Sequence, residues 1–84
     1  MNPYKIYVAV GVRFDREGRM TPLWIEWEDG RTYSIDAVRD VRRAASMKAG
    51  GTGLRYLCSV GGRQRHLYYE GPRWFVPAKG LEEP

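Results

Sequence analysis

Residues 4–14 read YKIYVAVGVRF, and every even position of this stretch, from Tyr4 to Phe14, is apolar. A period of two residues is typical of a β-strand that buries one face. Two acidic residues and a glycine follow at 15–18, where the chain must reverse. The alternation resumes from Leu23. The start of the chain therefore predicts a β-hairpin with one apolar face.

Turn length sets the register of these strands, because a slip of one residue exchanges the two faces. A three-residue loop with Gly30 in the left-handed conformation pairs Ile25 with Tyr33 and keeps both on the apolar face. A four-residue first turn pairs Val10 with Leu23 in the same way. We therefore expect three strands that share one continuous apolar face.

The second half of the chain repeats this organisation. The alternation in residues 54–60 is followed by a two-residue glycine turn, which pairs Tyr56 with Leu67. A further turn pairs Trp74 with Tyr69. These residues predict a second three-stranded antiparallel meander with its own apolar face.

Neither meander can leave its apolar face in water, so the fold class is mainly β, with the two meanders forming a small SH3-like or OB-like partly open barrel. Residues 1–76 form this single domain, and residues 77–84 a flexible tail. Arg65 falls opposite Cys58 on the apolar face, so we expect its head group in solvent at a rim of the barrel.

The linker between the meanders leaves two interpretations open. Asp36 could cap one short helix, since the apolar residues from Val38 to Ala45 have helical spacing. Equally, the third strand could run on through Val41 and open into a loop at 44–53. The sequence does not decide between helix, strand and loop here.

Four short stretches stand out, namely WEDGR at 27–31, RRAAS at 42–46, GGTGLRY at 50–56 and RWFV at 73–76. Together they resemble a family of short bacterial proteins of no known function, over most of residues 4–76. The strand order is also loosely similar to small β domains associated with bacterial DNA-damage-tolerance polymerases. The first resemblance implies no established activity.

The chain offers little material for catalysis. Its single cysteine, Cys58, and single histidine, His66, fall on opposite faces of the predicted sheet, which excludes a nucleophile–base pair. One cysteine and one histidine without clustered carboxylates cannot close a tetrahedral metal site. We therefore expect a non-enzymatic protein with no metal and no cofactor.

A lone cysteine also excludes an intramolecular disulfide, which favours a reducing cytoplasm. The apolar run at 6–12 is too short to span a bilayer. We therefore expect a soluble, cytoplasmic domain that does not enter the membrane.

The charge of the chain is unevenly distributed. Residues 1–36 hold five cationic and six acidic side chains, a net charge of −1, whereas residues 37–79 hold nine and two, a net charge of +7. A positive second half suits an acidic partner such as nucleic acid, although such arginines can also form a solvated rim. A basic, glycine-rich loop at 48–53 could contact a phosphate.

The best candidate site is the outer face of the second meander together with the basic linker, where aromatic, apolar and cationic residues gather. We expect an interaction module that docks a protein partner or a second copy of itself. The alternative is a nucleic-acid-binding module that combines positive charge with stacking aromatics. The candidate partner-binding residues are Arg39, Arg42, Arg43, Lys48, Arg55, Leu57, His66, Tyr68 and Phe75.

Overall fold

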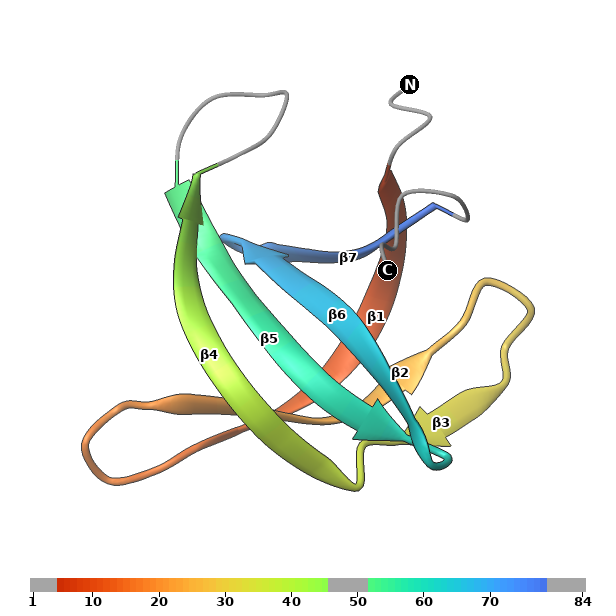
Figure 1. Ribbon diagram of the computed structural model, residues 1–84, viewed down its shortest axis with the longest axis horizontal. Coiled ribbons are helices and arrows are strands. Elements are labelled where there is room, and N and C mark those ends of the chain that lie inside the picture. Colours follow the sequence, from red (N-terminus) through yellow and green to blue (C-terminus); the bar gives the residue numbers. More distant parts are fainter. Residues whose placement is uncertain (1–4, 46–51, 79–84) are drawn as a thin grey trace.

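The computed structural model describes residues 5–45 and 52–78, which form one antiparallel sheet in the order β3-β2-β1-β7-β6-β5-β4 (Figure 1). No helix occurs among these residues. The strands are β1 (Lys5–Phe14), β2 (Met20–Glu26), β3 (Thr32–Ser34), β4 (Ala37–Ala45), β5 (Thr52–Val60), β6 (Arg63–Glu70) and β7 (Arg73–Pro77).

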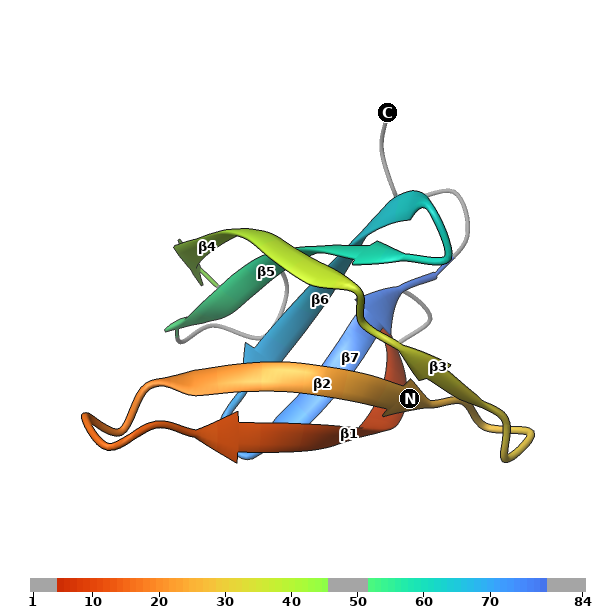
Figure 2. The same ribbon diagram turned by 90° about the horizontal axis from the view of Figure 1, so that it is seen from below.

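The long first strand joins the two halves of the sheet. Its residues Lys5–Val8 pair with β7, and its later residues, from Ala9 to Phe14, pair with β2. The sheet curls so that β1-β2-β3 faces β4-β5-β6-β7 (Figure 2). The predicted mainly β, partly open barrel is confirmed, with β4 added to the second meander as a fourth strand.

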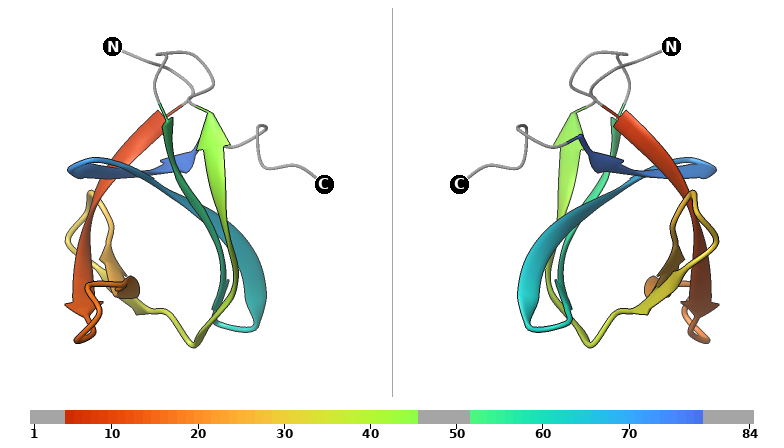
Figure 3. Two further views of the ribbon diagram at one scale, coloured as in Figure 1. Left: turned by 90° about the vertical axis from the view of Figure 1, so that its left-hand side faces the viewer. Right: turned by 90° about the vertical axis from the view of Figure 1, so that its right-hand side faces the viewer.

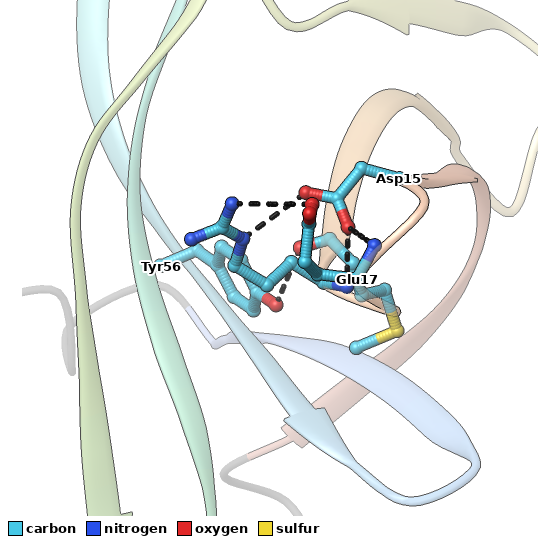
Figure 4. Close-up of polar contacts among 5 residues, drawn as sticks. Asp15, Glu17 and Tyr56 are labelled. Atoms are coloured by element: carbon cyan, nitrogen blue, oxygen red, sulfur yellow. Dashed lines mark hydrogen bonds and ion pairs between the residues drawn. The ribbon is translucent and has the colours of Figure 1, made fainter.

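The core lies between the two curled halves. Ile25 from β2 packs with buried side chains of β5, β6 and β7, and these are Tyr56, Cys58, Leu67 and Trp74. The Tyr56 hydroxyl also donates a hydrogen bond to the carbonyl oxygen of Met20, at 3.1 Å, which ties β5 to the start of β2 (Figure 4). The alternating apolar positions thus build a single core.

The predicted register is confirmed in most of the sheet. Ile25 lies opposite Tyr33, and Tyr56 lies opposite Leu67. Tyr69 likewise pairs with Trp74, and Cys58 with Arg65, whose side chain is exposed. The two glycine-containing turns of these hairpins fix their pairing because Gly30, Gly61 and Gly62 all take a positive φ.

The predicted register between the first two strands is wrong, because Val10 lies opposite Ile25 rather than Leu23. The turn is a three-residue loop rather than a four-residue one, since the Asp15 amide donates to the carbonyl of Arg19 and the Gly18 amide donates to the carbonyl of Asp15. The Asp15 carboxylate also accepts the amides of Glu17 and Arg19. A register shift then leaves Leu23 as an extra, exposed residue.

The helical interpretation of the linker is wrong for residues 37–45, which form β4 and pair with β5. Asp36 caps no helix. Its amide donates to the carbonyl of Ser59, and its carboxylate accepts the Gly61 amide in the next turn. The strand interpretation holds here, although strand pairing continues to Ala45, past the expected loop start.

The ends of the described chain bear on two further predictions. Pro77, assigned to the tail by the sequence, is the last residue of β7 and pairs with Lys5. The remaining tail residues from 79 onward, and residues 46–51 of the linker, lie outside the described residues. None of the described segments forms a helix that could cross a membrane.

Candidate binding surfaces

Cross-strand pairing aligns five residues on the outer face of the sheet, which is the face opposite the core. Arg42 pairs with Arg55, Arg55 with Tyr68, Tyr68 with Phe75, and Phe75 with Tyr7. Residues directly opposite in a sheet share one face. These five residues, named here the outer row, run from β4 to β1.

The aromatic half of the outer row is packed against itself. The Tyr68 and Phe75 rings stack at 4.9 Å with an interplanar angle of 2°, and the Tyr7 ring meets Phe75 edge-on at 5.8 Å. Phe75 is 4% exposed, so it is not an open stacking platform. Tyr68 is partly exposed and lies beside His66, at 6.3 Å between ring centroids.

A partly buried ion pair covers Phe75. The Lys5 ammonium lies 4.8 Å from the Phe75 ring centroid and 2.6 Å from Oε2 of Glu70. The Tyr7 hydroxyl donates to the other carboxylate oxygen of Glu70, at 2.8 Å. The hydrogen bond from Lys5 holds the pKa of Glu70 below its usual value, and the hydrogen bond to Glu70 raises the pKa of Tyr7.

The predicted linker cations divide between the two faces. Arg39 donates from Nε to the Ser59 hydroxyl at 3.0 Å, and Arg42 bonds Asp40 at 2.7 Å, so both lie with Arg55 on the outer face. Arg43 pairs with Leu54 and therefore points to the opposite face. The structure thus brings Arg39, Arg42 and Arg55 together without Arg43, and Lys48 lies outside the described residues.

Leu57, the remaining predicted site residue, is partly exposed on the outer face, opposite His66 on β6 and Asp40 on β4. It links the cationic end of that face to His66. Of the nine predicted residues, the structure gathers seven on the outer face, and these are Arg39, Arg42, Arg55, Leu57, His66, Tyr68 and Phe75.

A second surface, which sequence reasoning missed, lies along the opening of the barrel. The strands β3 and β4 are the two edges of the sheet and diverge from their short link at 35–36 (Figure 3). Tyr33 and Val41 stand on these edges on the core side, opposite the buried Ile25 and Tyr56. They are nevertheless 40% and 47% exposed, because no described strand covers them.

A third feature is an open cavity of about 350 Å³ where β1 leaves β7. The Arg73 guanidinium lies in its wall, 3.5 Å from the centroid of the Tyr7 ring. The lining residues are Tyr7, Val8, Ala9, Val10, Pro72, Arg73 and Trp74. No sequence pattern marks this site, because it is formed by a change of strand partner.

The groups with potential for catalysis do not converge. Cys58 is fully buried, and burial raises the pKa of its thiol to about 11. Cys58 pairs with Arg65, so His66, the next residue on β6, points to the other face. Within residues 5–45 and 52–78, no three metal-ligating side chains gather in a group.

Comparison with known proteins adds no neighbour: no family model, no curated protein and no solved structure matches the chain. The resemblance to short bacterial proteins therefore stays a prediction. The geometry of the surfaces alone carries the functional argument.

Proposed function

We propose that this domain is a non-enzymatic interaction module that docks a protein chain, including a second copy of itself, along the opening of its barrel. The observation that carries the proposal is Val41, a core-side residue that is 47% exposed on the edge strand β4. A strand edge presents unpaired N–H and C=O groups, and an adjacent apolar side chain adds area to bury. A docked strand would pair these backbone groups and bury the Val41 side chain.

The charges on β4 favour a second copy as the occupant. A two-fold, antiparallel pairing centred on Val41 would bring the two Val41 side chains together and set each Asp40 opposite Arg42 of the other copy. In one chain these two residues already bond each other at 2.7 Å. In the pair, the four charges would form an alternating network.

Sedimentation velocity over a concentration series tests this proposal. The wild-type domain is expected to show a monomer–dimer equilibrium, and Val41→Lys is expected to be monomeric at every concentration. Leu23→Lys is the matched control, since Leu23 is 44% exposed on an internal strand and its replacement should leave association unchanged. A wild-type monomer at high concentration would refute self-association.

We propose nucleic-acid binding as the second candidate, because Arg39, Arg42 and Arg55 share the outer face with Tyr68. Single-strand binders combine a positive groove with aromatic stacking. Tyr68 and His66 offer partly exposed rings beside these arginines, whereas Phe75 is buried. The available stacking surface is therefore smaller than the sequence suggests.

Binding of a mixed-sequence single-stranded oligonucleotide over a range of salt concentrations tests this candidate. Arg42→Ala with Arg55→Ala should weaken binding and reduce the slope of log K against log salt by roughly 1.4. The control pair Arg43→Ala and Arg63→Ala removes the same amount of charge from positions outside the outer row. It should have a smaller effect on binding. Equal effects of the two pairs, or no binding at low salt, would refute it.

We further propose that the barrel is of the SH3-like or OB-like type and that the domain works in a reducing, bacterial cytoplasm. The curled antiparallel sheet supports the first point. The buried, free thiol of Cys58 supports the second.

A further inference from the structure

A third free edge arises where β1 changes its partner. Lys5–Val8 pair with β7, but β7 begins at Arg73, and from Ala9 to Phe14 no described strand lies on that side of β1. Figure 2 shows β1 continuing past β7 toward its turn with β2. The backbone groups on this side are therefore open to an added strand.

The cavity of about 350 Å³ lies at the inner end of this edge. It is lined by residues from both faces of β1, with Val8 and Val10 on the core side and Tyr7 and Ala9 on the outer side. Trp74 adds apolar surface. A strand added along the edge would therefore end in a partly apolar cavity.

Arg73 is the charged residue among those that line this cavity. Among the described residues, no carboxylate lies within ion-pair distance of its guanidinium. Its cross-strand neighbour Glu70 bonds Lys5 and Tyr7 and interacts with Arg73 only at longer range. One face of the guanidinium covers the Tyr7 ring, at 3.5 Å. Its N–H donors lie in the guanidinium plane and suit the two oxygens of a carboxylate.

We propose that this edge binds an extended peptide that ends in a free C-terminal carboxylate, held by Arg73. Strand polarity gives the orientation. A peptide antiparallel to β1 runs from the Phe14 end toward Val10, so its carboxyl end arrives beside Arg73. A parallel peptide would bring its ammonium group there instead, against a like charge.

The side chains of β1 specify the peptide further. A final residue opposite Val10 points to the core side and into the cavity, and the residues opposite Val12 and Phe14 share that face. Phe14 is 65% exposed, so an apolar peptide side chain opposite it would shield its ring from water. The fourth residue, counted from the carboxyl end, lies opposite the exposed Arg13, which favours an acidic side chain at that position. The ligand class is an alternating strand with an apolar, carboxylate-bearing end.

This inference rests on the proposed docking function, but it uses a different surface from Val41. The probe is the pentapeptide acetyl-Val-Glu-Val-Thr-Val with a free carboxylate, compared with its C-terminal amide by calorimetry and amide-resolved NMR titration. The carboxylate form is expected to bind, with shifts centred on Val8–Phe14, Arg73 and Trp74. The amide should bind about tenfold or more weakly, since it loses the charge-assisted hydrogen bonds between the carboxylate and Arg73.

Variants of the full chain complete the test. Arg73→Gln is expected to weaken the carboxylate form as much as amidation does, and to bind both forms equally. Arg73→Lys keeps the positive charge but loses the planar pair of N–H donors, so its affinity for the carboxylate form should lie between those of the wild type and Arg73→Gln. Arg63→Gln, an exposed arginine at the Gly61-Gly62 turn, should bind as the wild type does.

Equal affinity for acid and amide, shifts elsewhere, or no binding of either peptide would overturn the inference. If Val41-dependent dimers persist in that case, the proposed function stands and only the peptide site fails.

Discussion

The indole of Trp24 lies across Gly11 on the outer face of the β1–β2 pair, and its ring occupies the space that a Cβ atom at position 11 would need. The glycine thus admits a large aromatic side chain onto the neighbouring strand. Trp24 remains 40% exposed, so the contact covers the strand without joining the core.

Gly11→Ala should therefore destabilise the domain through a clash with Trp24, by about 1–2 kcal/mol, as overpacked sites do. In a Trp24→Ala background the same substitution should cost much less, because the ring is gone. Urea denaturation of the four proteins measures this coupling. Equal costs in both backgrounds would contradict the packing of Trp24 over Gly11.

The hydrogen bond from Tyr56 to Met20 ties the two halves of the barrel, at 3.1 Å (Figure 4). Tyr56→Phe leaves the Met20 carbonyl without this donor and should cost about 1 kcal/mol of unfolding free energy. Tyr33→Phe removes a hydroxyl from an exposed ring and should cost little. The bond is not formed if the two variants are equally stable.

The Lys5–Glu70 pair predicts acid sensitivity. The hydrogen bond from Lys5 lowers the pKa of Glu70 in the folded state from its ordinary value of 4.5. A carboxyl with a depressed pKa stabilises the fold above that ordinary value, and this contribution is lost as the pH falls through the folded-state pKa. Stability should therefore decline below about pH 4.5.

Glu70→Gln should be less stable than the wild type at neutral pH, because it leaves the buried Lys5 ammonium without its counter-charge. The expected cost is about 1–2 kcal/mol, since the side chain at position 70 is partly exposed to water. Its stability should also fall less on acidification than that of the wild type. Glu26→Gln, at an exposed carboxylate, is the control. Thermal unfolding at several pH values gives the comparison, and parallel pH profiles for Glu70→Gln and the wild type would count against the ion pair.

Cys58 should resist modification in the folded protein. Burial raises the pKa of its thiol from 9.0 to about 11, which alone lowers the thiolate fraction about 100-fold. Iodoacetamide labelling at pH 8, followed by mass spectrometry, should be slow in buffer and fast in denaturant. Rapid labelling without denaturant would show that the core opens around Cys58.

Most of the fold could be predicted because alternating side chains and glycine turns are local signals. The pairing of Tyr56 with Leu67 follows from a two-residue turn, and the three-residue loop gives Ile25 opposite Tyr33. The β1–β2 register could not be obtained in this way. It depends on side-chain hydrogen bonds of Asp15 and on an extra residue at Leu23, which no alternation pattern marks.

The candidate site was predicted only in part, for the same reason. Register placed Tyr68 beside Phe75 correctly, but the sequence did not show that Lys5 and Glu70 cover Phe75. The linker was ambiguous because its apolar spacing suits helix and strand alike, and pairing with β5 decides for a strand. The exposed Val41 and the cavity at Arg73 result from where strands lack partners, which is a tertiary property.

Amide hydrogen exchange followed by NMR tests most directly whether the sheet leaves its edges open for docking. We expect protected amides where a strand is paired on both sides, which is the case for Leu54–Ser59 of β5, Tyr68 and Tyr69 of β6, and Trp74 and Phe75 of β7. Along Ala9–Phe14 and along β4, protected amides should alternate with rapidly exchanging ones, since every second residue points its N–H away from the only neighbouring strand. Uniform protection along both segments in the monomer would mean that these edges are covered, and would contradict the account.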